Sequence, residues 1–448
     1  MVAMLELLFA MLKEEYRIHT TLFDKRFFLV FPVVVGFISY LCCMFALRFF
    51  VDVYAVPVVG SLLFFVYGVS VGVFGLHARD ALNIRFDRLS LLLYSSRTLP
   101  LSSKIVLLTF AVQDMIYYFF LTILPVVLGI AFALHSLHVI LLLLAFSLMF
   151  FYGVSVSFLL TMLYSRFGKS FLFFAGVIGF FVFIYQDVWF NAAIVYAFLP
   201  VGIAFEFNLR LFMALLAVPV FIVLVSVGML ENEPRTGKRR STNLFEPVCR
   251  FVRSVSGKFC MFVAKDLVDM HRTTGGMSKI IFTYFIPAAL VWVMMDMFSR
   301  IFFAFNCTLM TFAVVVGVIS TGIYNWLNQY DSFANYRILP VSVRSVVVSK
   351  VVSFAIISSV SSVLILFSVA LGAGALSMFW VSLLLMFSVS FYVLSVLVYV
   401  AGLEPNVVLY DARAFVRYFA YCMPVLVPLM TASFFGAEAY GFVAVMCV

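Results

Sequence analysis

The chain has little charge and no polar stretch long enough to form a separate domain. Of its 448 residues, 11% are charged and 65% are hydrophobic, and the mean hydropathy is +1.18. Soluble globular domains are about half apolar and about a quarter charged. The longest polar segment, 231–260, is too short to fold alone. These shortages exclude a soluble globular protein.

The sequence also lacks the motifs of several functional classes. Its seven cysteines show neither paired spacing nor a CxxC motif, so they indicate no disulfide framework or zinc site. Thr236-Gly237-Lys238 lacks the upstream glycine of a P-loop, so we expect no ATP site here. His135 and His138 lie in a short loop without a third ligand nearby. The sequence therefore predicts no catalytic residues, no metal site and no cofactor of its own, and we expect no nucleic-acid partner.

What is abundant is long apolar runs, about 20 residues each, which are typical of bilayer-spanning helices. We expect an all-α, polytopic helical membrane protein with 11–12 spans whose main environment is the lipid bilayer. The expected spans are 27–47, 54–76, 104–134, 137–164, 169–187 and 209–230 in the first half, and 279–299, 301–323, 344–372, 376–401 and 414–434 in the second, followed by a short tail, 436–448.

Charge predicts the orientation of these spans. With the N-terminus in the cytosol, all but three of the 29 Lys and Arg residues are cytosolic, the exceptions being Arg48, Arg210 and Arg300. This follows the positive-inside rule and predicts a multi-pass protein of the plasma membrane. Residues 188–205 are apolar enough to span, but a crossing there would reverse everything downstream. We therefore interpret them as a re-entrant or interfacial element on the outer side.

One octet occurs twice, 240 positions apart. Residues 97–104 (R-T-L-P-L-S-S-K) return at 337–344 as R-I-L-P-V-S-V-R. Both copies lie in a basic loop before a long apolar run. Lys13-Glu14 and Lys265-Asp266 likewise match in amphipathic stretches that open the two halves, and Pro32 and Pro287 stand early in the spans that follow. We expect two parallel repeats of about six spans, each with an N-terminal amphipathic interfacial helix.

The repeat predicts the domain organisation. The first transmembrane repeat covers residues 1–230 and the second covers 259–448. Between them, the linker 231–258 carries seven basic and three acidic residues, which suits a cytosolic strap. In each octet the proline disfavours helix before it, and Ser102 and Ser342 are expected to cap the spans that follow.

These features resemble those of ABC-2-type permeases, the membrane subunits of ATP-driven exporters. The resemblance is carried by Lys265-Asp266-Leu267 in the amphipathic stretch, by Leu99 to Ser102 with Lys104, and by Leu339 to Ser342 with Lys350. Family members often have six spans and dimerise, whereas this chain looks like two fused units. The resemblance implies a transport subunit rather than an enzyme, with ATP and Mg²⁺ bound by separate P-loop ATPase subunits.

The same resemblance implies that loops 79–104 and 324–344 dock on those ATPase subunits. The candidate coupling residues are Arg85, Arg88, Arg97, Leu99, Pro100, Ser102, Lys104, Asn328, Asp331, Arg337, Leu339, Pro340, Ser342 and Arg344. An alternative hypothesis is an ion-coupled secondary transporter that uses Asp114, with Gln113, ten residues into the third span; a charge there is costly and by default functional. A membrane enzyme or scaffold is a third class. The transported substrate is unknown.

Overall fold

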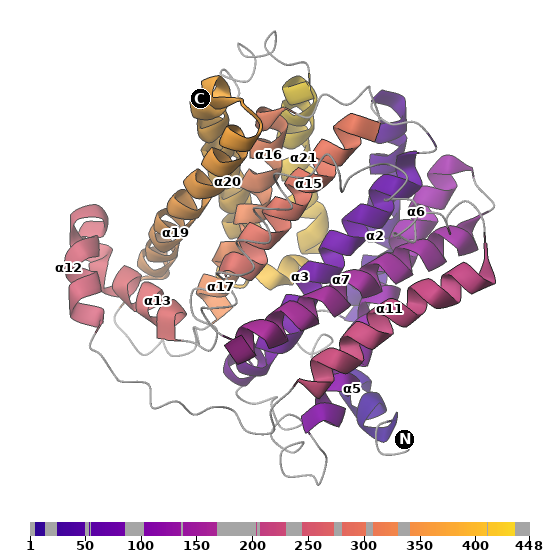
Figure 1. The fold of residues 1–448 in the computed structure, drawn as a ribbon. Helices are drawn as coiled ribbons and strands as arrows, with labels where there is room; N and C mark the ends of the chain where they lie inside the picture. The colour runs from indigo at the N-terminus through magenta and orange to yellow at the C-terminus, as the bar shows by residue number, and fades with distance from the viewer. Residues whose placement is uncertain are drawn as a thin grey trace. The chain divides into compact units, whose positions relative to one another are not determined.

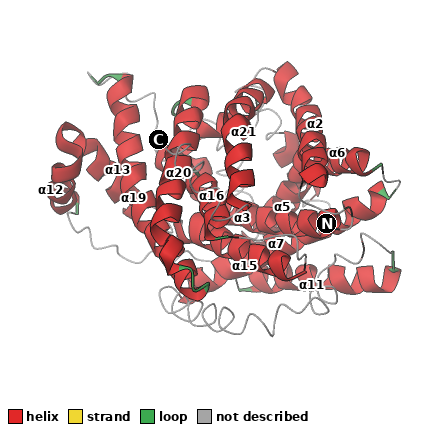
Figure 2. Cartoon of the chain, turned by 90° about the horizontal axis from the view of Figure 1, so that it is seen from above, coloured by secondary structure: helices red, strands yellow, loops and turns green. Residues whose placement is uncertain are grey.

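The computed structural model of the chain consists of helices and their connections (Figure 1). The structure describes residues 5–13, 25–49, 53, 55–85, 103–135, 138–167, 203, 207–229, 244–272, 280–301, 308–329, 341–409 and 411–434. None of these residues lies in a strand (Figure 2), which confirms the expected all-α class for this part of the chain.

Eight described helical segments are long and apolar enough to cross a membrane, so the chain is a multi-pass helical membrane protein. They are Val30–Arg48, Met115–Leu134, Val139–Leu160, Leu209–Gly228, Leu309–Asn328, Val343–Gly372, Leu376–Ala401 and Ala412–Ser433. Two shorter apolar helical segments, Val56–Gly72 and Thr283–Asp296, lie where the spans 54–76 and 279–299 were expected.

One expected span begins later than the sequence indicated. The helix predicted over 301–323 begins at Leu309, because Thr308 caps it: its Oγ1 accepts a hydrogen bond from the Thr311 amide at 3.2 Å. The expected span 169–187, nearly all of the outer element 188–205, and the tail 436–448 lie outside the described residues.

The chain divides into two compact units. The first comprises residues 1–76, 91–232 and 296–305, and the second comprises 77–90, 233–295 and 306–448. The labelled helices of the first unit are α2 (Lys25–Phe49), most of α3 (Ala55–Arg85), α5 (Ser103–Tyr118), the π-helical turn η1 (Phe119–Ile123), α6 (Leu124–Leu134), α7 (Val139–Phe167) and α11 (Leu209–Gly228).

Glycines allow the helices of the first unit to pack with their backbones in contact. On α2 and α6, a Cβ atom at Gly129 would lie 2.2 Å from the carbonyl oxygen of Gly36. On α3 and α7, a Cβ at Gly68 would lie 2.2 Å from the carbonyl oxygen of Phe150, and one at Gly153 would lie 2.2 Å from that of Phe65. Small residues at such crossings are typical of membrane helices, where close packing replaces the hydrophobic effect.

Gly68 and Gly72 also frame a sequence, G-V-S-V-G, with the spacing of the GxSxG nucleophile motif. That motif acts on a sharp strand-to-helix turn. Here the five residues lie inside α3, and the Ser70 hydroxyl donates to the carbonyl of Val66, one turn back, at 3.0 Å. The glycines therefore serve helix packing, and Ser70 is not placed as a nucleophile.

Replacing Gly68 with alanine is expected to destabilise the first unit by about 1–3 kcal/mol, since the added carbon forces α3 away from α7. Gly228→Ala is the matched control, because a Cβ there would meet nothing within 4 Å. Thermal unfolding of the purified protein in detergent measures both. Equal stabilities for the two variants would contradict the close crossing.

Two helices widen into π-helical turns just before a proline. η1 precedes Leu124-Pro125, and η4 (Ile281–Phe285) precedes Ile286-Pro287 at the start of α15 (Ile286–Ile301). Proline has no N–H to donate, and its ring clashes with the carbonyl four residues back. A wider turn relieves this clash while the helix continues, so neither proline ends its helix.

The second unit is built around the pair α16 (Leu309–Ser320) and α20 (Phe379–Ala401), with α21 (Ala412–Phe434) against them. Met310, Val314, Leu385 and Val389 belong to their shared core. The other helical elements of this unit include α12 (Phe245–Ser256), η3 (Gly257–Phe259), α13 (Cys260–Arg272), α17 (Gly322–Gln329), α19 (Val343–Gly372), η5 (Leu376–Met378) and η6 (Pro405–Leu409). α12 thus occupies the second half of the predicted linker 231–258 and packs against α13.

Polar side chains inside the second unit join its helices. Thr308 Oγ1 donates to the carbonyl of Ser433 at 3.0 Å, which ties the start of α16 to the end of α21. Beyond the other end of α16, the hydroxyl of Tyr324 on α17 donates to the carbonyl of Gly402, directly after α20, at 3.1 Å. α19 and α20 are connected by residues 373–378, so the two long helices run antiparallel. The start of α19 and the start of α20 therefore lie at opposite ends of the unit.

Candidate functional site

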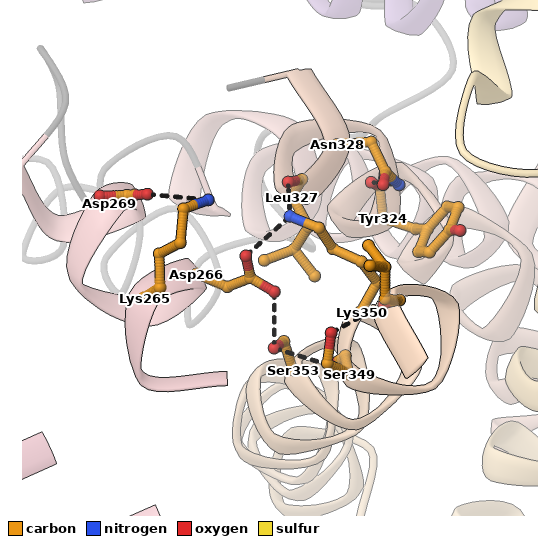
Figure 3. Close-up of polar contacts among 10 residues, drawn as sticks. Lys265, Asp266, Asp269, Tyr324, Leu327, Asn328, Ser349, Lys350 and Ser353 are labelled. Atoms are coloured by element: carbon orange, nitrogen blue, oxygen red, sulfur yellow. Dashed lines mark hydrogen bonds and ion pairs between the residues drawn. The ribbon is translucent and has the colours of Figure 1, made fainter. Parts of the chain in front are cut away.

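The most unusual feature of the second unit is a buried ion pair between two helices that are distant in sequence. The Nζ atom of Lys350 on α19 lies 2.7 Å from Oδ1 of Asp266 on α13 (Figure 3). Lys350 is 1% exposed and Asp266 is 5% exposed. Charged residues of both signs are almost never fully buried unless they are paired. The pair therefore fixes α13 against α19 at one point.

The pattern of α13 explains why Asp266 is buried. Val263, Ala264 and Val268 are buried with it on the face toward the rest of the unit. The opposite face is more exposed, and there Lys265 and Asp269 form a salt bridge of 3.4 Å one turn apart. Such exposed pairs contribute a few tenths of a kcal/mol. α13 is thus an amphipathic helix, as expected, but it has one acidic residue on its buried face.

α19 places Lys350 on its own buried stripe. Val346, Ser349, Ser353 and Ile357 share that stripe, with the spacing of a helix face. The helix begins at Ser342, whose Oγ accepts a hydrogen bond from the Ser345 amide at 3.2 Å. The predicted capping role of Ser342 is therefore confirmed. Lys350 follows this cap by about two turns.

Further hydrogen bonds surround the two charges (Figure 3). Lys350 Nζ also donates to the carbonyl oxygen of Leu327 on α17 at 2.7 Å. The Ser353 hydroxyl lies 3.1 Å from Oδ2 of Asp266 and 2.9 Å from the carbonyl oxygen of Ser349. Both carboxylate oxygens thus have a donor. Three helices, α13, α17 and α19, meet at a single ammonium group.

α17 places a buried polar side chain near this ion pair. Asn328 is 5% exposed, and its Nδ2 donates to the carbonyl of Tyr324 at 2.9 Å (Figure 3). Asn328 is one of the candidate coupling residues that the structure describes, and it directly follows Leu327, whose carbonyl accepts a hydrogen bond from Lys350. Through this bond its side chain joins two consecutive turns at the end of α17.

The structure describes only some of the remaining candidate coupling residues. Ser342 and Arg344 are exposed at the start of α19. Arg85 lies in α3 and Lys104 in α5, without a description of their side chains. Outside the described residues lie Arg88, Arg97, Leu99, Pro100, Ser102, Asp331, Arg337, Leu339 and Pro340. Gln113 is buried in α5, and Asp114 follows it there with its side chain undescribed.

Sequence reasoning missed the ion pair itself. It treated Asp266 and Lys350 as parts of two separate motifs and named Asp114 as the costly intramembrane charge of the alternative hypothesis. The signal was present, because Lys350 lies inside the apolar run 344–372, where a charge needs a partner. In the part of the chain that the structure describes, no group of three or more His, Cys, Asp and Glu residues could hold a metal ion.

Removing the cap of α19 is expected to have a local effect. Ser342→Ala should cost about 1 kcal/mol and let the first turn of the helix fray, whereas Ser342→Asp should keep the cap. Hydrogen exchange at residues 343–346 measures this directly. Unchanged exchange in the alanine variant would show that the cap contributes nothing.

Searches of family models, of curated proteins and of solved structures return no match to this chain.

Proposed function

We propose that this chain is the membrane subunit of an ATP-driven exporter of the ABC-2 type, with two parallel repeats of about six spans in one polypeptide. The N-terminus and the basic loops lie in the cytosol of a plasma-membrane protein. ATP and Mg²⁺ bind to separate P-loop ATPase subunits, and this chain supplies the transmembrane route.

The observation that carries the proposal is the buried contact between Asp266 and Lys350. The resemblance drew on Lys265-Asp266-Leu267 and on Leu339 to Ser342 followed by Lys350, two motifs about 80 residues apart. One charged residue from each motif, Asp266 and Lys350, meet at 2.7 Å. Residues that were singled out from motifs alone thus share one structural role, which supports the resemblance over a chance match of short patterns.

The contacts of the ion pair are suited to transmitting a mechanical displacement from the loop to the helices. A partner that displaces the loop before Ser342 acts on the first turn of α19. Two turns later, Lys350 connects α19 to α13 through Asp266 and to α17 through the Leu327 carbonyl. Separating these groups would leave buried charges unpaired, which is costly. The three helices are therefore expected to move as one body.

In the proposed cycle, ATPase subunits dock at loops 79–104 and 324–344, and ATP-driven closure of those subunits displaces both loops. The spans rearrange and open an outward route. Discrete rearrangement of packed helices, rather than continuous bending, is the usual way in which such displacements propagate.

Affinity purification tests the proposal. The tagged chain, extracted in mild detergent from its native membrane, is expected to carry a stoichiometric P-loop ATPase with measurable ATP hydrolysis. Purification without any ATPase, together with ion-gradient-driven uptake that Asp114→Asn abolishes, would contradict the proposal and favour the secondary transporter.

A further inference from the structure

Two cysteines face each other across the helical hairpin of α12 and α13. The sulfur of Cys249 lies 3.5 Å from that of Cys260, in the orientation of a thiol–thiol hydrogen bond. Cys249 lies in the second turn of α12, and Cys260 is the first residue of α13. The sequence, in which ten residues separate them, gives no familiar paired spacing, so only the fold brings them together.

The hairpin holds the two thiols in this arrangement. Gly257, with φ of +51°, lets the chain turn directly after α12. Val252 on α12 is buried at 1% exposure, and the Ser256 hydroxyl donates to the carbonyl of Val252 at 2.9 Å. α12 therefore packs on α13 through an ordered face, and Cys249 lies beside that face.

Both thiols are also accessible. Cys249 and Cys260 are partly exposed, in contrast to Cys43 and Cys422, which are buried inside their helical packing. Around the pair the hairpin is basic, with Arg250, Arg253 and Lys258 on its surface. Small oxidants can reach partly exposed sulfur atoms of this kind.

We propose that Cys249 and Cys260 form a reversible disulfide-forming site that locks α12 to α13. The co-reactant is a hydroperoxide. One cysteine loses its proton, and its thiolate attacks the peroxide, takes up one oxygen as a sulfenic acid and releases an alcohol or water. The second thiol then displaces that oxygen as water, and the S–S bond forms. In total the two thiols lose two electrons and two protons, and the peroxide is reduced by two electrons.

The chemistry agrees with a switch that is reduced at rest. The hydrogen bond to Cys260, and then burial, raise the pKa of Cys249, while Arg253 lowers it in part. Since the thiolate is the nucleophile, oxidation is expected to accelerate as pH rises. In a reducing cytosol, disulfides are mostly transient and regulatory. Because α13 carries Asp266, the lock would act on the helix that the ion pair fixes to α19.

The test uses the full-length protein in detergent or liposomes, with hydrogen peroxide as the probe. Wild type is expected to lose two hydrogen atoms in intact mass and to yield a peptide in which Cys249 is joined to Cys260. Dithiothreitol should reverse both changes. Hydrogen exchange of the α12 amides should slow on oxidation.

Three variants and one internal control make the result specific. In Cys249→Ser or Cys260→Ser the remaining cysteine is expected to stop at the sulfenic acid, which dimedone traps, and exchange in α12 should not slow. Cys42 and Cys43, which are adjacent on α2, are the internal control: their side chains diverge by about 100° around the helix, so no disulfide is expected there.

Phenylarsine oxide, which needs two neighbouring thiols, should bind wild type and not the single serine variants or the double variant Cys249→Ser/Cys260→Ser. Independent sulfenic acids at both positions in wild type, without the joined peptide, would overturn the proposal. So would unchanged exchange in α12 after the disulfide has formed. Either result would leave the proposed transport function untouched, since that function does not depend on the thiols.

Discussion

Lys350→Met is expected to destabilise the second unit by about 3–5 kcal/mol, because it leaves the Asp266 carboxylate buried without its counter-charge. The substitution nearly preserves side-chain length, so the loss of charge, rather than a cavity, dominates the effect. Asp266→Asn should cost a similar amount, since it leaves the ammonium group without a negative partner. Thermal unfolding in detergent, or denaturation by added SDS, measures the difference.

The double variant Lys350→Met/Asp266→Leu distinguishes the interaction between the two residues from the effect of losing either residue alone. Removing both charges together is often close to neutral, even where each single removal is severe. We therefore expect the double variant to recover most of the stability that either single variant loses. Additive losses in the double-mutant cycle would show that the two residues do not interact.

A matched control lies on the same helix. Lys265 and Asp269 form the exposed pair of α13, at 3.4 Å and with 39% and 41% of their side chains exposed. Lys265→Met should change stability by about 0.5 kcal/mol or less, because surface pairs contribute little. A loss as large as that of Lys350→Met would mean that α13 tolerates no change of charge anywhere, and the argument from burial would fail.

Replacing Arg97, Pro100, Arg337 and Pro340 with alanine is expected to abolish coupled transport while the protein still folds. The physical reason is that these residues are expected to form the contact corners of loops 79–104 and 324–344, not the helix packing. ATP hydrolysis by the copurified ATPase should fall to its level without this chain, and ATP-dependent export should be lost.

Variants that change only one of the two octets test the two loops separately. Arg97→Ala/Pro100→Ala and Arg337→Ala/Pro340→Ala each leave one octet intact, so each should retain part of the stimulation if the two loops are equivalent. Intact stimulation and transport in the fourfold variant would show that the octets are not the coupling corners. An unchanged melting temperature is the control for folding.

Much of the fold could be predicted because long apolar runs in the sequence mark the membrane-spanning helices directly. The runs that became α7, α19 and α20 are long and uninterrupted, and their bounds agree with the structure within a few residues. The start of α16 at Leu309 was not predictable in the same way, since it depends on a threonine cap inside an apolar region. The widened turns before Pro125 and Pro287 likewise depend on local geometry that hydropathy does not record.

The candidate site was predicted in part. Ser342 could be identified as a helix cap because a hydroxyl residue after proline and before an apolar run is a local signal. The Asp266–Lys350 pair could not, because it joins residues 84 positions apart, and one sequence contains no record of which charges meet. The contact of Cys249 with Cys260 was hidden for the same reason: it depends on the path of the α12–α13 hairpin.

Site-specific photo-crosslinking tests the central claim, that a soluble ATPase acts on the end of the second unit where α19 begins. Val343 and Trp380 are almost equally exposed, at 72% and 74%, but stand near the starts of two antiparallel helices and so at opposite ends of the unit. With benzoylphenylalanine at either position in the native membrane, we predict a crosslink to a P-loop ATPase from position 343 and none from position 380. No ATPase crosslink from position 343, or equal crosslinks from both positions, would contradict the account.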